Sequence, residues 1–209
     1  MVGDGSLTLQ EFAMSESLPL ATIHDAVLQF LQGRDDLAIY GAQAVNAYVE
    51  PPRMTQDIDV IAIDAASLAE EIRVHLVATF VIAVRVREVA SGVGFRVYQV
   101  RKPKNRHLVD VRQETSLPSC QLIGGLKVLT PAELVARKII SMVSRANTPK
   151  AMTDTADVWR LLLAFPALKS VRGDVASLLA SLEANPQVTE RWQQVVATTI
   201  EPEIEDDDY

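Results

Sequence analysis

The fold is decided by one stretch of the chain, Tyr40-Gly41-Ala42-Gln43-Ala44-Val45-Asn46-Ala47-Tyr48 followed by Arg53-Met54-Thr55-Gln56-Asp57-Ile58-Asp59-Val60. An apolar run over residues 37–40 stops at a glycine, a short helical stretch follows, and two aspartates then open a second apolar run. Successive side chains of an extended chain point to opposite faces, so Asp57 and Asp59 are expected on the same face of one strand. The stretch therefore predicts a strand, a turn, a short helix and a second strand that begins with two carboxylates.

The two carboxylates indicate a metal-dependent reaction on phosphates. Magnesium is held by one or two protein carboxylates together with phosphate oxygens, and a pair of such ions can stabilise both the attacking and the leaving oxygen. An Asp-x-Asp pair alone is a weak signal, because aspartates near a strand end also cap turns or face solvent. The residues upstream of the pair favour the metal site.

With a glycine after the first strand, a short helix, and then Arg-x-Thr-x-Asp-x-Asp before an apolar strand, the chain resembles the polymerase-beta type nucleotidyltransferases. It is most similar to the AbiEii-like group, whose members include toxins of bacterial toxin–antitoxin pairs. The resemblance covers about residues 37–165. It implies an α/β fold class: a mixed sheet of the nucleotidyltransferase fold, flanked by helices and followed by a C-terminal helical bundle.

The resemblance also assigns roles to residues further along the chain. A third aspartate, Asp110, would lie on a strand beside the Asp-x-Asp strand, where it completes the metal site or takes the proton from the attacking hydroxyl. An aspartate inside an apolar strand is costly to bury unless it is paired or bound to metal, which favours a functional role for it. Asp157 would orient the catalytic lysine, Lys138. Arg145, Lys150 and Asp154 also fall in the order in which the family places its functional residues, and Arg145 and Lys150 are expected to contact the nucleotide.

Lys138 and Arg145 stand seven residues apart, so they share one face of a predicted helix and both could point at the cleft. We predict that Lys138 contacts the nucleotide phosphates and offsets developing charge. The alternative is a lysine that lies along the helix surface between apolar neighbours.

The first turn departs from the family pattern. The family usually has Gly-Gly or Gly-Ser there, where small residues admit a triphosphate and a hydroxyl can bind it, whereas this chain has Gly41-Ala42-Gln43. Ala42 preserves the close approach of the backbone but supplies no hydroxyl. Thr55 could supply one if the second strand begins early enough to place it on the face of Asp57. Together with Arg53, these residues make up the predicted triphosphate site.

Length and composition indicate the class of protein. The chain has 209 residues, 48% of them apolar, which is enough to bury a core. It has no apolar stretch of the ~18 residues that a membrane span needs, and Asp4 and Glu11 stand where a secretory signal would carry positive charge. Cys120 is the only cysteine. We therefore expect a cytoplasmic protein without a membrane span, an intramolecular disulfide or a cysteine zinc cluster.

Charge is distributed unevenly along the chain. The formal net charge is −7, and six acidic residues stand between 201 and 209. Six basic residues and a single acidic one stand between Arg96 and Arg112. This basic stretch fits a phosphate backbone or a triphosphate, and it fits the solvated tip of a hairpin equally well.

Hydrophobic periodicity predicts the remaining elements. Helices are expected over 20–31, 65–79, 153–165, 171–182 and 188–198. Another is expected to begin at Thr130-Pro131-Ala132-Glu133, a capping-box pattern with Thr130 as the N-cap and proline at the first helical position. Strands are expected over 81–89, 95–100 and 107–111, the first two joined as a hairpin. Residues 113–129 indicate a connection between domains. We predict a nucleotidyltransferase domain over 1–125, which includes an irregular arm over 1–17, and a helical domain with an acidic tail over 126–209.

Together, the residues and the resemblance predict a magnesium-dependent nucleotidyltransferase. Two magnesium ions would be held by Asp57, Asp59 and Asp110, and NMP would pass from a nucleoside triphosphate to an acceptor hydroxyl with release of pyrophosphate. By resemblance, the acceptor is an RNA, such as a tRNA end, or a protein, and the enzyme is a toxin whose cognate antitoxin blocks it.

Three alternatives remain open. The same residues could adenylylate a small hydroxyl compound such as an aminoglycoside, although the basic stretch argues mildly against this. The missing hydroxyl after Gly41 leaves open a catalytically inactive binding module. Transfer of the γ-phosphoryl group in place of the nucleotide would use the same metals.

Overall fold

The computed structural model describes residues 18–89, 92–182 and 185–202, which form seven strands and seven α-helices. The strands are β1 (Leu37–Tyr40), β2 (Ile58–Ala62), β3 (Val84–Val89), β4 (Gly94–Gln99), β5 (Arg106–Gln113), β6 (Cys120–Ile123) and β7 (Leu126–Leu129). The helices are α2 (Leu20–Leu31), α3 (Gly41–Asn46), α4 (Ala65–Phe80), α5 (Pro131–Ser144), α6 (Pro149–Ala164), α7 (Asp174–Ser181) and α8 (Pro186–Ala197). The arm predicted over 1–17 and most of the acidic tail lie outside the described residues.

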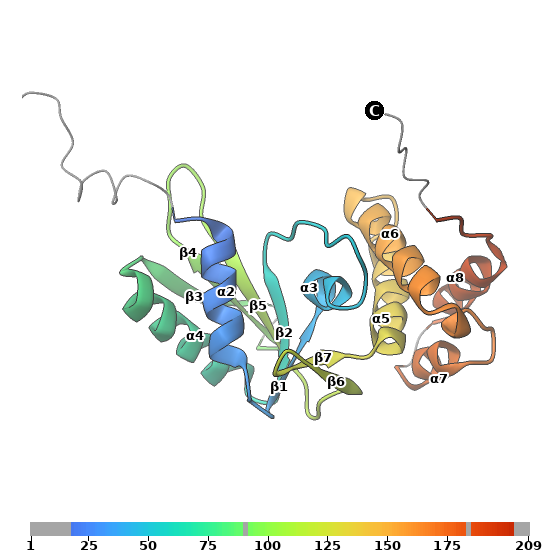
Figure 1. Cartoon of the computed structure of the whole chain (residues 1–209), viewed down its shortest axis with the longest axis horizontal. Helices are drawn as coiled ribbons and strands as arrows, with labels where there is room; N and C mark the ends of the chain where they lie inside the picture. Colours follow the sequence, from blue (N-terminus) through green and yellow to red (C-terminus); the bar gives the residue numbers. More distant parts are fainter. Residues whose placement is uncertain (1–17, 90–91, 183–184, 203–209) are drawn as a thin grey trace, which may run out of the picture.

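All seven strands belong to one mixed sheet, in the order β3-β4-β5-β2-β1-β7-β6. Strand β2 lies near its middle, parallel to β5 and antiparallel to β1. Helices α2 and α4 lie at the β3–β5 end of the sheet, and helices α5 to α8 form a bundle at the other end (Figure 1). The predicted α/β fold class, a mixed sheet flanked by helices and followed by a helical bundle, is confirmed.

Helix α4 covers one face of strands β3, β4 and β5. Its buried side chains recur at helical spacing and meet buried valines of the strands, among them Val97 and Val109. Because side chains alternate along a strand, the neighbour of Val109, Asp110, points to the opposite face. The apolar packing of α4 therefore leaves the other face of the sheet to polar side chains.

The helical bundle is built around α5, on which α6, α7 and α8 all pack. The N-cap predicted for α5 is confirmed: Pro131 is at the first helical position, and the hydroxyl oxygen of Thr130 accepts a hydrogen bond from the N–H of Glu133 at 3.4 Å. Trp192 of α8 is almost fully buried, and its indole N–H donates to the carbonyl of Ser170 at 3.3 Å. These contacts fix α5, and with it Lys138, relative to the rest of the bundle.

The segment 113–129 differs from the prediction of a connection between domains. Strands β6 and β7 form a hairpin there, and β7 joins the main sheet parallel to β1. Its turn is made by Gly124 and Gly125, whose φ angles of 56° and 79° a glycine adopts without steric cost. The division predicted at 125/126 runs through this turn, and it stays a prediction.

The other elements fall close to their predicted positions. Helix α2 has the predicted bounds, α4 runs one residue further, and the β3–β4 hairpin and β5 are present. Helix α6 begins at Pro149 rather than at 153, because the hydroxyl oxygen of Thr148 caps it by accepting a hydrogen bond from the N–H of Ala151. Helix α7 is shorter than predicted. None of the described helices combines the length and the apolar character needed to cross a membrane.

Candidate active site

Asp59 stands on β2, on the face of the sheet that α4 leaves free. In the register of the strands it lies directly between Tyr40 of β1 and Asp110 of β5. Its neighbours Ile58 and Val60 point to the opposite face and are fully buried. The expectation that Asp110 lies on the strand beside Asp59 is confirmed.

Gly41 allows the backbone to pass directly over the carboxylate of Asp59. Its φ angle is +69°, in the region that favours glycine. A Cβ atom at this position would lie 1.9 Å from Oδ2 of Asp59. The glycine at the start of α3 is therefore required on two counts, its backbone conformation and its contact with the aspartate.

The surroundings of Asp59 disfavour the ionised form of its carboxylate. Burial, together with the charges of Asp57 and Asp110, raises its pKa to about 7. Lys150 and Lys138 are close enough to lower it, yet within the described residues no hydrogen bond to Asp59 offsets the burial. Asp59 therefore has no ion-pair partner among the described residues.

Asp57 and Thr55 lie before the strand and not in it. Strand β2 begins at Ile58, and Asp57 stands in a bend. The early strand start that would place Thr55 on the face of Asp57 is wrong, because the chain from Arg53 to Thr55 has no strand partner. The charge of Asp57 nevertheless acts on Asp59, so the two carboxylates lie near each other.

Asp110 is already engaged by an arginine. Nε and Nη2 of Arg96 donate to Oδ1 and Oδ2 of Asp110, both at 2.6 Å. This is the bidentate geometry that Arg–carboxylate pairs favour. Each oxygen of Asp110 therefore already accepts a hydrogen bond from the guanidinium.

Asp57 and Asp59 fit a divalent cation without the help of a third carboxylate. Among the described residues, no group of three or more His, Cys, Asp or Glu side chains is arranged to hold a metal ion. Magnesium needs only one or two protein carboxylates when phosphate oxygens complete its shell. The carboxylate of Asp59, partly buried and without a counterion, fits that requirement, and Asp110 as a third ligand stays a prediction.

Lys138 lies in a network of ion pairs between α5 and α6. Its Nζ donates to Asp157 at 2.5 Å and to Asp154 at 3.0 Å. Arg145 pairs with the other oxygen of Asp154 at 2.8 Å. The contact predicted between Asp157 and Lys138 is present, and Arg145 shares the face of Lys138 as predicted. The structure thus places Lys138 among acids, and not along an apolar helix surface.

Arg53 extends this network to the loop before β2. Its Nε and Nη2 donate to the two oxygens of Asp157 at 2.7 and 2.8 Å. Although burial favours the neutral acid, hydrogen bonds from Arg53 and the charge of Lys138 lower the pKa of Asp157. The amide of Asn46, at the end of α3, accepts from the N–H of Arg53 and donates to its carbonyl. The loop that carries Thr55 and Asp57 is thereby fixed to the helical bundle.

The other predicted residues lie around the carboxylates. Ala42 follows Gly41 in α3 and is partly buried. Lys150 is exposed in the first turn of α6, and its charge reaches Asp59. Arg53 and Arg145, predicted to contact nucleotide, are both held by aspartates of α6.

Sequence reasoning missed two residues of this region and gave no partner to a third. Arg96 stood only in the basic stretch, Asn46 had no assigned role, and Asp154 was not paired with Lys138. The spacing of Asp154 and Asp157, one helical turn apart, could have indicated that both face the same lysine. The pairing of Arg96 with Asp110 depends on which strands are neighbours, and no local pattern encodes that.

A sequence profile described as "Nucleotidyl transferase AbiEii toxin, Type IV TA system" matches residues 25–205. The chain belongs to this family. The match extends well beyond the span of 37–165 that the motifs alone suggested. Family membership makes the protein a transferase of the nucleotidyltransferase type. A comparison with curated protein sequences found no match.

Two solved structures share the family's fold at low sequence identity. The Megavirus polyadenylate synthase has a TM-score of 0.57 at 12% identity, over 70% of this chain and 32% of its own. JHP933 from Helicobacter pylori has a TM-score of 0.54 at 13% identity, over 91% of this chain and 82% of its own. This chain therefore spans about a third of the viral enzyme and most of the bacterial protein.

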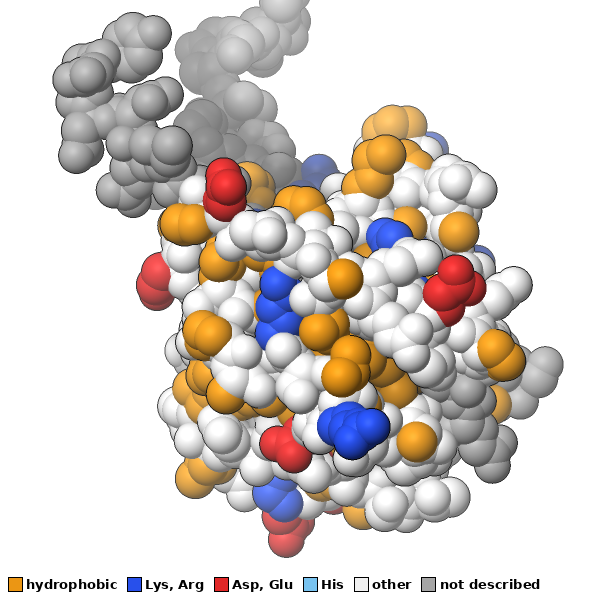
Figure 2. All heavy atoms as spheres, turned by 90° about the vertical axis from the view of Figure 1, so that its right-hand side faces the viewer, with side chains coloured by type: hydrophobic (Ala, Val, Ile, Leu, Met, Phe, Trp, Pro, Cys, Tyr) orange, Lys and Arg blue, Asp and Glu red, His pale blue; other side chains and the backbone are white. Residues whose placement is uncertain are grey.

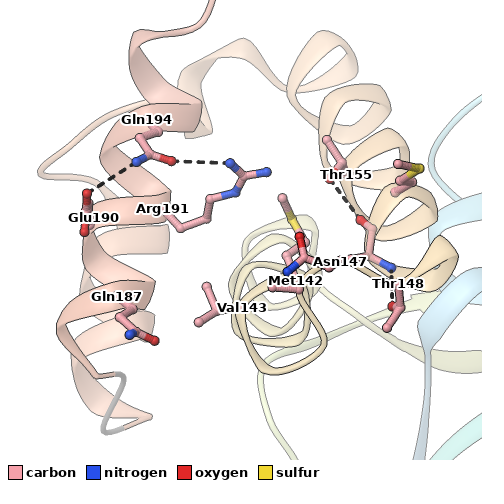
Figure 3. A pocket seen from close by; sticks show the side chains of 12 residues that line it. Met142, Val143, Asn147, Thr148, Thr155, Gln187, Glu190, Arg191 and Gln194 are labelled. Carbon is pink, nitrogen blue, oxygen red and sulfur yellow. Dashed lines mark hydrogen bonds between the residues drawn. The ribbon is translucent and has the colours of Figure 1, made fainter.

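A separate pocket of about 450 Å³ lies in the helical bundle, between α5, α6 and α8 (Figure 3). Arg191 of α8 donates to the side-chain oxygen of Gln194 at 3.3 Å, and Gln194 donates to Glu190. Helix α6 lines it with Met152 and Thr155, whereas the aspartates of that helix turn toward Lys138. None of the predicted site residues lines this pocket.

Replacing Gly41 by alanine should displace the carboxylate of Asp59. We expect Gly41→Ala to lower the free energy of unfolding, measured with urea, by roughly 1–3 kcal/mol more than Gly33→Ala. Gly33 is the matched control, because its φ is +75° but a Cβ there meets nothing within 4 Å. Equal losses in the two variants would contradict the close contact between Gly41 and Asp59.

The raised pKa of Asp59 predicts a pH-dependent cost in stability. Because the folded pKa of about 7 exceeds that of the unfolded chain, the unfolded state binds fewer protons between these values, and stability falls as the pH rises through them. Asp59→Asn should therefore be more stable than the wild type at pH 8, by roughly 1–3 kcal/mol, and should lose this advantage at pH 4.

Urea unfolding at the two pH values measures the effect. The control is Asp174→Asn, at an exposed aspartate in the first turn of α7, and it should show no such gain. A wild type that is as stable as Asp59→Asn at pH 8 would contradict the raised pKa.

Proposed function

We propose that this protein is a magnesium-dependent enzyme that transfers NMP from a nucleoside triphosphate to an acceptor hydroxyl, with release of pyrophosphate. The acceptor is an RNA, such as a tRNA end, or a protein. The enzyme acts as the toxin of a bacterial pair, and a cognate antitoxin blocks it. Family membership supports the type of reaction, and the description of the family as type IV toxins supports the partner.

The observation that carries this proposal is the carboxylate of Asp59. Its pKa is raised to about 7 because it is buried beside Asp57 and Asp110, and no hydrogen bond from a described residue offsets this. A protein gains nothing in stability from such a group, and perturbed carboxylates cluster at functional sites. A divalent cation held by Asp57 and Asp59 removes the repulsion between them.

Bound magnesium would neutralise the phosphate oxygens and offset the charge that develops on the departing pyrophosphate. The chain's own residues do the rest. Gly41 and Ala42 are small enough to admit the phosphates beside Asp59, and Thr55 would contribute its hydroxyl from the loop before β2 and not from the strand. Lys150, exposed at the start of α6, attracts the triphosphate.

Lys138 acts as the centre of a network with positive net charge. The network contains three basic side chains, Lys138, Arg53 and Arg145, and only two acidic ones, Asp154 and Asp157. The surplus positive charge favours phosphate binding next to Asp59. Asp157 holds Lys138 in position, Arg53 helps to keep Asp157 ionised, and Arg145 pairs with Asp154.

A labelling experiment tests the transfer. The purified protein is incubated with magnesium, total bacterial RNA and each α-labelled nucleoside triphosphate in turn. We expect RNase-sensitive label in RNA or protease-sensitive label in protein, lowered by about 100-fold or more in Asp57→Asn. Asp57 is chosen because it lies outside every helix and strand, so that its replacement leaves the fold intact.

Two controls make the result specific. Asp174→Asn should label as the wild type does, because this aspartate is exposed on α7. A parallel incubation with γ-labelled triphosphate should leave no label in the acceptor. Label from the γ position would indicate phosphoryl transfer instead, and the absence of product with any triphosphate would contradict an active enzyme.

A further inference from the structure

One row of paired residues crosses five strands on the face that carries Asp59. The register of the strands places Arg87 of β3 opposite Arg96 of β4, Arg96 opposite Asp110 of β5, Asp110 opposite Asp59 of β2, and Asp59 opposite Tyr40 of β1. Directly paired residues share a face of the sheet. The row therefore joins two arginines to the predicted active site without interruption.

Further arginines border this row. Arg85 and Arg112 stand two residues along the same strands from Arg87 and Asp110, so they point to the same face. Arg85, Arg87 and Arg112 are exposed. The one acid of the row beyond Asp59 is Asp110, and Arg96 neutralises it. This face of β3, β4 and β5 is consequently positive, although the chain as a whole is negative.

The ion pair with Asp110 fixes the orientation of the Arg96 guanidinium. The carboxylate of Asp110 takes Nε and Nη2, which leaves Nη1 of Arg96 without a partner among the described residues. The hydrogen bonds and charge of Asp110 raise the pKa of Arg96. A guanidinium fixed along one edge presents its remaining N–H groups in one direction, which is how arginine recognises phosphate.

We propose that Asp110 does not bind magnesium but orients Arg96, and that Arg96, flanked by Arg87 and Arg112, binds the phosphate backbone of a single-stranded RNA acceptor. This inference rests on the function proposed above and names its acceptor. The RNA lies across β3, β4 and β5, and its terminal hydroxyl reaches Asp59. Asp110 is a positioning residue, and it acts through Arg96.

The dimensions of the sheet agree with such an acceptor. Neighbouring strands lie about 4.8 Å apart, so Arg96 stands about 10 Å from Asp59 along the row and Arg87 about 5 Å further. A single strand with a rise of about 3.4 Å per nucleotide spans this distance with a few nucleotides. Several phosphates can then meet arginines while the terminal hydroxyl is at the active site.

Two further features favour RNA over a protein acceptor. Tyr98 is directly opposite Arg85 in the same set of paired residues, and an aromatic ring among arginines gives a base a surface for stacking. On the face formed by the C-terminal helices, Lys and Arg side chains lie apart from one another, with apolar atoms and acidic side chains between them (Figure 2). The arginines of the row instead occupy paired or neighbouring positions that lead to Asp59.

RNA binding is tested with a fluorescein-labelled single-stranded RNA of 20 nucleotides and mixed sequence as the probe. Fluorescence anisotropy is measured in salt from 50 to 200 mM. We expect Arg96→Gln to lower the affinity by about 10-fold and the slope of log K against log salt by about 0.7, since one phosphate contact is lost. Arg73→Gln should change neither quantity.

Arg73 is a matched control. It is also paired with an acid, Glu70, and its side chain is 28% exposed against 26% for Arg96. It lies on α4, which covers the opposite face of the sheet. An equal loss of RNA affinity in Arg96→Gln and Arg73→Gln would show that only the net charge matters, and it would overturn the inference. Unchanged RNA affinity in Arg96→Gln would also overturn it.

Asp110→Asn separates a positioning role from simple repulsion. If Asp110 orients Arg96, its replacement weakens RNA binding in the wild type and has no such effect in Arg96→Gln. Stronger RNA binding in Asp110→Asn would show that the acid only repels the backbone, and it would overturn the inference. Urea midpoints of each variant confirm that the comparison is made between folded proteins.

Binding of Mn²⁺, followed by electron paramagnetic resonance, tests the other half of the proposal. Asp59→Asn should weaken Mn²⁺ binding by about 10-fold or more, whereas Asp110→Asn should leave it within about 3-fold. Equal losses of Mn²⁺ affinity in the two variants would show that Asp110 is a metal ligand, and they would overturn its role as the residue that orients Arg96. Wild-type binding of Mn²⁺ with no effect of Arg96 on RNA would overturn this inference alone, while absent Mn²⁺ binding would overturn the proposed function.

Discussion

The structure depends on one unfavourable feature, a partly buried carboxylate that no side chain in the described part of the chain pairs with. Asp59 stands between two other aspartates, and its pKa is raised to about 7 by burial and by their charges. Gly41 closes over it so tightly that any side chain there would overlap its oxygen. Burying an unpaired charge costs stability, and a fold retains such a group where a ligand supplies the missing charge.

Several of the charged side chains around Asp59 are, in contrast, held in ion pairs. Lys138, Arg53 and Arg145 hold the two aspartates of α6, and this network fixes the loop before β2 to the helical bundle. Removing one partner of such a network leaves a buried charge behind, so Lys138 serves stability as well as chemistry. On the other side, Arg96 neutralises Asp110 and continues the basic row. The contrast between these neighbours and Asp59 is what marks the site.

The local sequence was sufficient to predict the parts of the fold that residues close together in the chain determine. The glycine turn, the Asp-x-Asp pair, the bounds of α2 and the cap at Thr130 follow from periodicity and capping, and the fold class followed from the family resemblance. The hairpin of β6 and β7 did not, because its short strands gain their stability from pairing with β1. The partners of Asp110 and Arg53 also depend on which elements become neighbours, and that is a property of the whole fold.

In the proposed function, Asp59 binds a cation that enters the site together with the nucleotide. The most direct test is a ¹³C NMR titration of the aspartate carboxyl groups, with the signal of Asp59 assigned from Asp59→Asn. In the free protein, Asp59 should titrate with a pKa near 7. In the presence of magnesium and a non-hydrolysable nucleoside triphosphate, its pKa should fall below about 5, because a bound cation favours the ionised form. A titration that the metal and nucleotide leave unchanged would contradict the account.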